Sequence, residues 1–438
     1  MNAMRSVRKI VVLGANGAMG SGSGAVFASA GVPTTFLARS LEKAEAGRAR
    51  AEQLAKGKIP PKSIHCGTYD ADLARVVADA DLVFEAVSED IETKREIFDL
   101  IDRVRAPGSI VATVSSGLSI GEMCADRSTD FRAHFLGVHL FNPPTAIVGC
   151  EVIPHAGTAP GVVEGVRALL EKTFGRVVVE CADTPAFAGN RIGFKVLNEV
   201  AQLAEVHGVA YMDQLLGAHS GRALAPLATI DLVGWDVHKA IVDNLWDATQ
   251  DEAHASFMLP AYMARGIAQG HLGRKTRDKG GFFRMEGKGE TAKHFVLDPA
   301  TGQYRPLEEV RPPLPTFIEK MKAAIRTGKH PEALDVLCNS TGRDAGILRG
   351  VLLGYISYSL ARVGEVVAHA RDVDRIMGFG FNWAPPSVLV DAIGAARTID
   401  LLERADLIVP PVVFEAARTG KPLLDEPAIE PARFFVAA

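Results

Sequence analysis

The chain has little of what marks secreted, membrane-spanning or nucleic-acid-binding proteins. Its five cysteines are scattered and include no Cys-x-x-Cys pair, which argues against a disulfide scaffold and a zinc site. The apolar run behind the basic N-terminus ends at Gly14, too early for a signal peptide or a membrane span. A net charge of −4 leaves no overall basic surface for nucleic acid. We therefore expect a cytoplasmic protein with no metal, membrane or nucleic-acid partner.

What the chain does contain is typical of a soluble globular protein. It has 438 residues, of which 47% are hydrophobic and 23% are charged. This length favours two or three domains, and this composition allows each of them a sizeable core. An anionic ligand has to be held by local positive charge, because the whole protein carries a slight negative excess.

The N-terminal region alternates between apolar runs and helical patterns. Residues 8–14, "RKIVVLG", form a short apolar run that ends in glycine, as buried parallel strands do. A glycine-rich turn, a small-residue helix at 23–31 and a second strand at 34–38 complete a βαβ unit. Helical patterns such as residues 92–104 separate further apolar runs, which are found at residues 80–87, 109–116, 135–141 and 176–183. This alternation predicts a doubly wound α/β domain of the Rossmann type over residues 1–183.

After residue 183 long amphipathic patterns replace the strands, and part of this region is repeated. Residues 226–234, "PLATIDLVG", and 386–394, "PSVLVDAIG", share proline, aspartate and glycine at the same spacing. Each segment follows a predicted helix with a glutamate, Glu205 or Glu365. We infer an all-α region that contains two copies of one helical module. The predicted domains are therefore residues 1–183, a first helical domain at 184–290, a connecting segment at 291–344 and a second helical module at 345–438.

The turn between the first strand and the first helix is rich in glycine. It reads "GANGAMGSG" over residues 14–22. Glycine lets the backbone approach a pyrophosphate, and the N-terminus of the following helix favours negative charge. We predict that a dinucleotide binds here; a tight turn without a ligand is the alternative. The candidate cofactor-binding residues in this turn are Gly14, Asn16, Gly17, Ala18, Met19 and Gly20.

The glycine spacing also admits a rival class of enzyme. Extended short-chain dehydrogenases use a similar Gly-x-x-Gly-x-x-Gly pattern, and their catalysis depends on a Tyr-x-x-x-Lys arrangement. None of the six tyrosines in this chain has a lysine four residues later. The sequence therefore disfavours that class.

The end of the second strand bears on the choice of cofactor. In a unit that binds NAD, an acidic residue at this position accepts hydrogen bonds from the ribose hydroxyls. Here Ala38 takes its place, and Arg39 and Ser40 follow. A guanidinium can hold an adenosine 2′-phosphate through two parallel hydrogen bonds, while Ser40 and Lys43 add a contact and a charge. We predict that NADP(H) is preferred over NAD(H); the alternative is that Arg39 covers the sheet edge or stacks on the adenine, which leaves NAD usable.

Several segments together carry a family resemblance. Residues 137–154, "GVHLFNPPTAIVGCEVIP", resemble the signature of the L-3-hydroxyacyl-CoA dehydrogenases, which runs Gly-x-His-Phe-Phe-Asn-Pro and continues to Glu-Val-Ile/Val. The duplicated helical module is similar to the dehydrogenase part of bacterial fatty-acid oxidation proteins. Four other segments match the family in the right order, and they are residues 85–98, 113–120, 183–194 and 223–236.

This resemblance implies an oxidoreductase that interconverts a 3-hydroxyacyl-CoA and a 3-oxoacyl-CoA with a nicotinamide cofactor, as in fatty-acid β-oxidation. His139 is then the general base, because histidine titrates in the useful range, and Glu151 on a neighbouring strand fixes its tautomer. The resemblance also assigns Ser115 to the substrate hydroxyl and Asn190 to the reacting carbonyl region. An extra glycine after the serine pair makes Ser116 an alternative to Ser115.

Two further groups of residues take expected roles from the family. Glu89 and Lys94 fall where the family lines the nicotinamide, although a solvated helix start with an acidic cap is the alternative. Residues 43–62 follow the second strand, where the family helps to hold CoA, although a solvated helix face is again the alternative. The basic side chains offered to the CoA phosphates are Lys43, Arg48, Arg50, Lys56, Lys58 and Lys62. The loop at 273–283 resembles the family's Lys-Thr-Gly-x-Gly-Phe loop in enlarged form, so the specificity for the acyl tail is open.

Two other functions and the assembly state stay open at this stage. One alternative is a related NAD(P)-dependent dehydrogenase that acts on a free hydroxy acid instead of a CoA thioester. The other is a nucleotide-binding sensor that has lost catalysis, against which the intact His139, Glu151, Ser115 and Asn190 set argues. Relatives with a single helical module pair through it, so a second copy in the same chain allows either a monomer or a homodimer.

Overall fold

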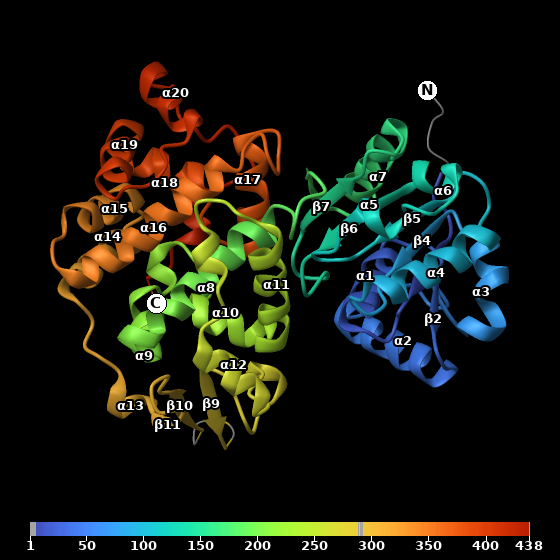
Figure 1. Ribbon diagram of the computed structural model, residues 1–438, viewed down its shortest axis with the longest axis horizontal. Coiled ribbons are helices and arrows are strands. Elements are labelled where there is room, and N and C mark those ends of the chain that lie inside the picture. Colours follow the sequence, from blue (N-terminus) through green and yellow to red (C-terminus); the bar gives the residue numbers. More distant parts are fainter. Residues whose placement is uncertain (1–5, 288, 290–291, 438) are drawn as a thin grey trace. The chain divides into compact units, whose positions relative to one another are not determined.

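The computed structural model describes residues 6–287, 289 and 292–437, so the first five residues of the N-terminal stretch lie outside it. Contacts separate two compact units, which are both drawn in Figure 1. The first unit runs to Ala188 and also contains Gly364–Ala368 and Phe379–Phe381. The second unit begins at Gly189 and contains the remaining residues.

The first unit, blue to teal in Figure 1, is built on a mixed sheet with strand order β3-β2-β1-β4-β5-β6-β7-β8 among the described residues. Neighbouring strands are parallel, except that β6 and β7 run antiparallel. The order reverses between β1 and β4, where open α/β sheets bind their ligands. The strands are β1 (Ile10–Leu13), β2 (Thr34–Ala38), β3 (Ile64–Thr68), β4 (Leu82–Glu85), β5 (Ile110–Thr113), β6 (Phe135–Leu140), β7 (Gly149–Pro154) and β8 (Val177–Glu180).

Local sequence explains why helices alternate with these strands. The side-chain oxygens of Ser40, Thr68 and Asp90 accept backbone N–H groups and begin three of the helices. Strands β1, β4 and β5 are buried along their whole length, as expected of a sheet covered by helices on both faces. The helices of this unit are α1 (Ala18–Ser29), α2 (Leu41–Ala55), α3 (Tyr69–Ala78), α4 (Ile91–Val104), α5 (Ile120–Met123), α6 (Thr129–Ala133) and α7 (Pro160–Lys172). The predicted doubly wound domain is confirmed.

The glycine-rich turn between β1 and α1 needs glycine for steric reasons. Gly14 has φ +71°, and a Cβ atom there would lie 2.2 Å from the carbonyl oxygen of Ala86. A Cβ atom on Gly20 would lie 2.4 Å from the Gly14 carbonyl oxygen. The turn is therefore pressed against the end of β4, and α1 starts directly behind it.

The second unit is mainly helical, as predicted, and its two halves repeat one design. Helices α8 and α16 each have 19 residues. Asp231 accepts the N–H groups of Phe282 and Phe283, and Asp391, at the equivalent place in the repeat, accepts those of Leu423 and Leu424. The helices are α8 (Gly189–His207), α9 (Val209–Leu215), α10 (Pro226–Val233), α11 (Trp235–Ala248), α12 (Ala261–Ala268), α13 (Leu307–Val310), α14 (Thr316–Arg326), α15 (His330–Asn339), α16 (Arg343–Ala361), α17 (Ala370–Ile376), α18 (Pro386–Ile393), α19 (Ala395–Arg404) and α20 (Pro411–Thr419).

A buried network of charges joins the two modules inside this unit. Asp251 accepts hydrogen bonds from Arg191 at 2.8 Å and from the hydroxyl of Tyr358 at 2.8 Å. Arg362 adds a third bond to Asp251 at 3.2 Å and also binds the carboxylate of Glu252. Because Arg191 begins α8 while Tyr358 and Arg362 belong to α16 and its C-cap, the network binds the first helix of each module to the other.

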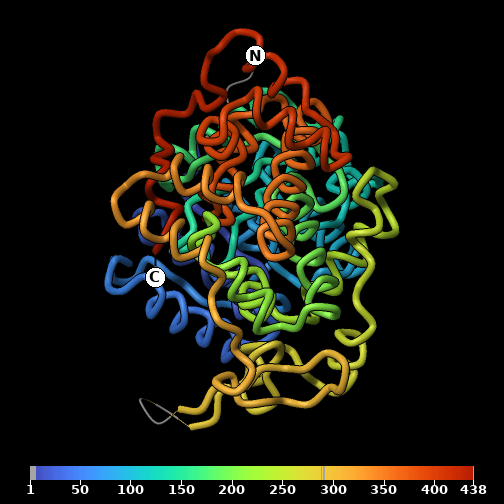
Figure 2. The backbone as a smooth tube through the Cα atoms, turned by 90° about the vertical axis from the view of Figure 1, so that its left-hand side faces the viewer, coloured from blue at the N-terminus to red at the C-terminus, as the bar shows by residue number. Residues whose placement is uncertain are grey.

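The helical region departs from the sequence prediction in two places. It is not entirely helical, because the strands β9 (Phe283–Glu286), β10 (Lys293–Leu297) and β11 (Tyr304–Pro306) form a small antiparallel sheet. Figure 2 shows this sheet, in yellow and orange, at one end of the second unit. Glu205 lies on α8 as predicted, whereas Glu365 lies in a turn after α16 instead of on a helix. Among the described residues no helix combines the length and apolar character needed to cross a bilayer.

Candidate active site

His139 and Glu151 face each other across the antiparallel strands β6 and β7. They are direct partners in the strand register, and Nδ1 of His139 lies 2.6 Å from Oε2 of Glu151. Both side chains are buried, Glu151 completely. Antiparallel partners carry their side chains on the same face of a sheet, so the register itself brings the imidazole and the carboxylate together. This geometry fixes the ring so that Nδ1 donates to the carboxylate and Nε2 is left for chemistry.

The second oxygen of Glu151 is held by the segment that follows β8. Oε1 accepts the N–H of Ala188 at 3.0 Å and the thiol of Cys181 at 3.5 Å. Ala186 and Phe187 both adopt the left-handed conformation, with φ of +58° and +56°, which is strained for side chains other than glycine. These two residues turn the chain so that the Ala188 N–H points at the carboxylate. The sequence carries no sign of this, because neither residue type favours that backbone conformation.

Two aromatic rings enclose the imidazole of His139. The ring centroid of Phe141 lies 4.8 Å from that of His139, and the centroid of Phe187 lies 5.9 Å from it. No residue in the described part of the chain forms a hydrogen bond with Nε2 of His139. The imidazole therefore lies against apolar side chains of the first unit.

The serine pair after β5 is organised by Glu89. Oε1 of Glu89 accepts the hydroxyl of Ser115 at 2.6 Å and the N–H of Ser116 at 2.8 Å. Ser115 is 1% exposed, whereas Ser116 is half-buried. The hydroxyl of Ser116 also donates to Oε1 of Glu89, at the longer distance of 3.5 Å, and Ser116 is the more accessible member of the pair.

Behind Glu89 lies an ion pair that the sequence prediction did not single out. Lys94, at the start of α4, donates to both oxygens of Glu85 at 2.9 and 2.8 Å, and the Thr113 hydroxyl donates to the same carboxylate at 2.6 Å. Lys94 also lies 3.4 Å from Oε2 of Glu89. The one sign in the sequence is a glutamate that ends the apolar run of β4, where a charge is rarely buried without a partner.

The turn after β1 presents backbone groups at the N-terminus of α1. Gly17 caps this helix, and Ala18 and Met19 form its first turn. The carbonyl of Asn16 accepts a hydrogen bond from Arg50 on α2 at 3.4 Å. Gly14 and Gly20 need glycine because the backbone of Ala86 and of Gly14 packs against them, and the N-terminus of α1 behind this tight turn favours an anion such as a pyrophosphate.

Tyr69 is a second residue that the sequence prediction missed. Its hydroxyl oxygen accepts the N–H of Gly14 at 2.8 Å. Burial raises the pKa of Tyr69, and the Gly14 hydrogen bond and the charge of Arg39 act in the opposite direction. The phenol therefore stays protonated, and its oxygen accepts the backbone hydrogen bond of the glycine turn. Arg39 itself is exposed, and Ser40 beside it caps α2 by accepting the N–H of Lys43.

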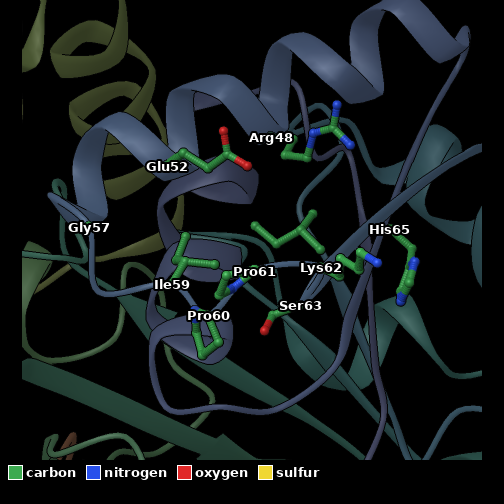
Figure 3. Close-up of a pocket in the computed structure, with 10 residues that line it drawn as sticks. Arg48, Glu52, Gly57, Ile59, Pro60, Pro61, Lys62, Ser63 and His65 are labelled. Carbon is green, nitrogen blue, oxygen red and sulfur yellow. The ribbon is translucent and has the colours of Figure 1, made fainter.

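Two of the basic residues expected near CoA line one cavity of the first unit. Arg48 and Lys62 line a cavity of about 490 Å³ between α2 and the loop before β3, together with Glu52 and His65 (Figure 3). Lys43 lies in the first turn of α2, and the role of this region in holding CoA stays a prediction. Asn190, the last of the predicted site residues, is buried in the first turn of α8 in the second unit.

Two family patterns match the chain in succession. The NAD binding domain of 3-hydroxyacyl-CoA dehydrogenase matches residues 9–184, and the C-terminal domain of 3-hydroxyacyl-CoA dehydrogenase matches residues 187–282. A probable 3-hydroxyacyl-CoA dehydrogenase of Deinococcus radiodurans is 32% identical over an alignment of 301 residues that covers 66% of this chain and 85% of the relative.

Two longer matches extend over nearly the whole chain. A probable 3-hydroxyacyl-CoA dehydrogenase of Bacillus subtilis is 31% identical over an alignment of 445 residues that covers 95% of this chain, yet the chain spans about half of that relative, 55% of its length. The crystal structure of 3-hydroxybutyryl-CoA dehydrogenase from Escherichia coli K12 superposes with a TM-score of 0.69, covering 95% of this chain and 99% of the other. At 21% identity this second likeness concerns the fold alone.

Proposed function

The chain belongs to the 3-hydroxyacyl-CoA dehydrogenase family of oxidoreductases, and we propose that it interconverts a 3-hydroxyacyl-CoA and the corresponding 3-oxoacyl-CoA. The observation that carries this proposal is the buried pair of His139 and Glu151, with Nδ1 and Oε2 2.6 Å apart. In the oxidative direction the C3 hydroxyl loses a proton to Nε2 of His139 while hydride leaves C3. In the reverse direction the imidazolium returns that proton to the oxygen.

Glu151 makes this proton transfer efficient. Its Oε2 accepts from Nδ1 of His139, so the ring presents an unprotonated Nε2 to the substrate and the positive charge that forms is stabilised. The Ala188 N–H and the Cys181 thiol hold the other carboxylate oxygen, which keeps the carboxylate from rotating. Positioning of this kind contributes to rate because it is in place before the reaction begins.

We assign the polar contact with the C3 oxygen to Ser116, with Asn190 as a further contact. The accessibility of Ser116, and the shorter hydrogen bond that the Ser115 hydroxyl makes to Glu89, support this choice over Ser115. A hydroxyl or amide aimed at the C3 oxygen stabilises negative charge as the carbonyl is attacked by hydride.

A nicotinamide cofactor supplies the hydride acceptor at its ring when it is bound. The turn of Gly14, Gly17 and Gly20 with the N-terminus of α1 holds its pyrophosphate, and Glu89 and Lys94 lie beyond the end of β4, where the strand order reverses. We further propose that Arg39 and Ser40 hold an adenosine 2′-phosphate, so that NADP(H) is preferred. The absence of an acid at Ala38 and the exposed guanidinium beside it support that preference.

The decisive experiment combines a substrate panel with one substitution. Purified protein is assayed on short, medium and long 3-oxoacyl-CoA esters, with NADH and with NADPH, by the absorbance of the reduced cofactor. We expect turnover of at least one ester and a loss of ~10²–10⁴-fold in kcat for His139→Ala. His369→Ala, which changes an exposed histidine, is the matched control. If the protein turns over free hydroxy acids and no CoA ester, it is a hydroxy-acid dehydrogenase and the proposed function is wrong.

A further inference from the structure

A segment of the second helical module lies in the first compact unit. Phe379–Phe381 belongs by sequence to the module at 345–438, yet it groups with β6 and β7 by its contacts. It ends a π-helical turn, Met377–Phe381, that continues α17, and Asn382 behind it is left-handed with φ +57°. Helical turns of the π type are uncommon and occur often at functional sites.

Two glycines allow this segment to touch the sheet directly. A Cβ atom on Gly149, the first residue of β7, would lie 2.6 Å from the backbone nitrogen of Gly380. A Cβ atom on Gly380 would lie 3.0 Å from the ring of Phe141. The backbone of the second module is thus in contact with the strand that carries Glu151 two residues further on.

The neighbouring segment Gly364–Ala368 makes a second attachment. The carbonyl of Val366 accepts the N–H of Ala182 at 2.9 Å. Ala182 follows Cys181, whose thiol donates to Glu151. The second module therefore contacts the chain at two points close to the residues that hold the catalytic pair.

A chain of aromatic rings leads from this segment to the imidazole. The rings of Phe381 and Phe141 meet edge to face, with centroids 5.7 Å apart and an interplanar angle of 69°. Phe141 in turn contacts His139 at 4.8 Å. Edge-to-face pairs have a preferred geometry, so the position of Phe381 determines where Phe141 rests against the imidazole.

We propose that Phe381 is a positioning residue for the dehydrogenase reaction, which it serves by holding Phe141 against His139. The inference rests on the proposed role of His139 as the acid–base group. It gives the segment Phe379–Phe381, which belongs to the first unit by its contacts, a part in the active site of that unit. Without Phe381 the ring of Phe141 loses its edge-to-face partner, and water and ring motion reach the imidazole.

The test measures both turnover and the accessibility of His139. Phe381→Ala should lower kcat by roughly 10- to 100-fold, because a misplaced acid–base group costs rate steeply, while KM for the cofactor stays unchanged. Phe381→Leu keeps an apolar support and should recover most of the rate. Phe414→Ala, which removes an exposed phenylalanine on α20 of the same module, should behave as wild type.

Chemical modification separates this role from a general loss of stability. Diethyl pyrocarbonate reacts with accessible imidazoles, and mass spectrometry of the peptide with His139 gives its rate relative to the exposed His65. We expect a severalfold faster reaction of His139 in Phe381→Ala than in wild type or Phe414→Ala. An unchanged relative rate in a folded variant overturns the proposal. If Phe381→Ala does not fold, Gly380→Ala takes its place, since its methyl group displaces Phe141; an unchanged rate there also overturns it.

This readout is independent of the substrate. If the wild type turns over no acyl-CoA, the proposed function fails, while the modification rates still decide whether Phe381 controls access to His139. If the wild type is active and His139 is equally protected in every variant, the positioning role fails and the proposed function stands.

Discussion

Glu85 and Lys94 form an ion pair from which solvent is completely excluded, with Nζ of Lys94 2.8 and 2.9 Å from the two carboxylate oxygens. Glu85 ends β4 and Lys94 lies in the first turn of α4, so the pair closes the loop that also carries Glu89. In the strand register Glu85 lies beside Leu13, the last residue before the glycine turn. The ion pair therefore fixes both the glutamate that holds the serine pair and the edge of the glycine turn.

Removing one member of this pair should be costly. Lys94→Met leaves the carboxylate of Glu85 buried without its counter-charge, and losses of about 3–5 kcal/mol are typical of that situation. Urea unfolding of the first unit, followed by circular dichroism, measures the change in free energy. Glu92→Gln breaks an exposed pair with Arg95 on the same helix and should cost less than about 1 kcal/mol.

The double variant Glu85→Gln/Lys94→Met distinguishes a buried charge from lost packing. It removes both charges, so it should be more stable than Lys94→Met alone. If the double variant is no more stable than the single one, the uncompensated charge is not the cause of the loss.

Glu151→Gln should preserve the fold and lower kcat by ~10²-fold or more, the usual range for a disturbed acid–base pair. The two donors lie at different oxygens of Glu151, Ala188 at Oε1 and His139 at Oε2, and an amide has an oxygen at only one of these two places. Keeping the bond to Ala188 turns the amide nitrogen toward the imidazole, which then has to accept at Nδ1 and carries its proton on Nε2. Steady-state kinetics measures the effect, with Glu180→Gln on β8 as the exposed control. A near-normal kcat would mean that Glu151 does not determine which nitrogen of His139 carries the proton.

The two serines should differ in their kinetic effects. Ser116→Ala should raise KM for the acyl substrate or lower kcat, because we place its hydroxyl against the C3 oxygen. Ser115→Ala should act mainly on stability, since it deprives Glu89 of a buried donor 2.6 Å away. Kinetics and thermal melting of both variants test this assignment. The reverse pattern would return the substrate contact to Ser115.

The sequence was most informative where one strand or turn contains the whole pattern. The alternation of apolar runs with helices predicted the doubly wound sheet, and His139 with Glu151 pointed to neighbouring strands because twelve residues suffice for a return strand. The ion pair of Glu85 was not predicted, because its partner Lys94 lies on the next helix. Ala186 and Phe187 gave no sign of their left-handed backbone, and Phe381 lies far along the chain from His139. Contacts between residues so far apart in the chain depend on tertiary packing, which local sequence patterns do not predict.

Asp374, in the second unit, should make stability depend on pH. Burial raises its pKa to about 7, while the hydrogen bonds from Ser387 act in the opposite direction. A raised pKa of an acid means that the folded state holds a proton that the unfolded state releases at lower pH. The stabilisation is therefore complete below the unfolded pKa near 4 and is lost as pH rises through about 7.

Asp374→Asn, which is neutral at every pH, tests this dependence. Relative to wild type, the variant should gain stability between pH 5 and pH 8, by an amount that thermal melting at both values measures. Asp72→Asn, at the start of α3 in the first unit, is the control. The pKa of Asp72 is lowered by the Thr68 N–H and Arg75, so this carboxylate stabilises the fold above its unfolded pKa, and the stabilisation is lost as pH falls. A constant difference between wild type and Asp374→Asn would mean that Asp374 is ionised in the folded protein.

The preference between the two nicotinamide cofactors should follow from the corner between β2 and α2. The strand ends at the buried Ala38, so no carboxylate is present there to accept the ribose hydroxyls, and Arg39 is exposed directly behind it. The hydroxyl of Tyr69 accepts the N–H of Gly14, the first glycine of the turn. We propose that the guanidinium of Arg39 meets the adenosine ribose, because two parallel hydrogen bonds to a 2′-phosphate suit its planar shape.

We expect wild type to show a higher kcat/KM with NADPH than with NADH, and Ala38→Asp/Arg39→Ile to reverse the order. The new carboxylate would accept ribose hydroxyls and repel a 2′-phosphate. Binding of both cofactors in the absence of substrate, measured by quenching of the protein's own fluorescence, separates affinity from turnover. Lys43→Ala should weaken NADPH binding less than Arg39→Ile, since a single ammonium makes no bidentate contact. A wild type that prefers NADH, with a preference the double change leaves unaltered, would mean that Arg39 covers the sheet edge and takes no part in cofactor choice.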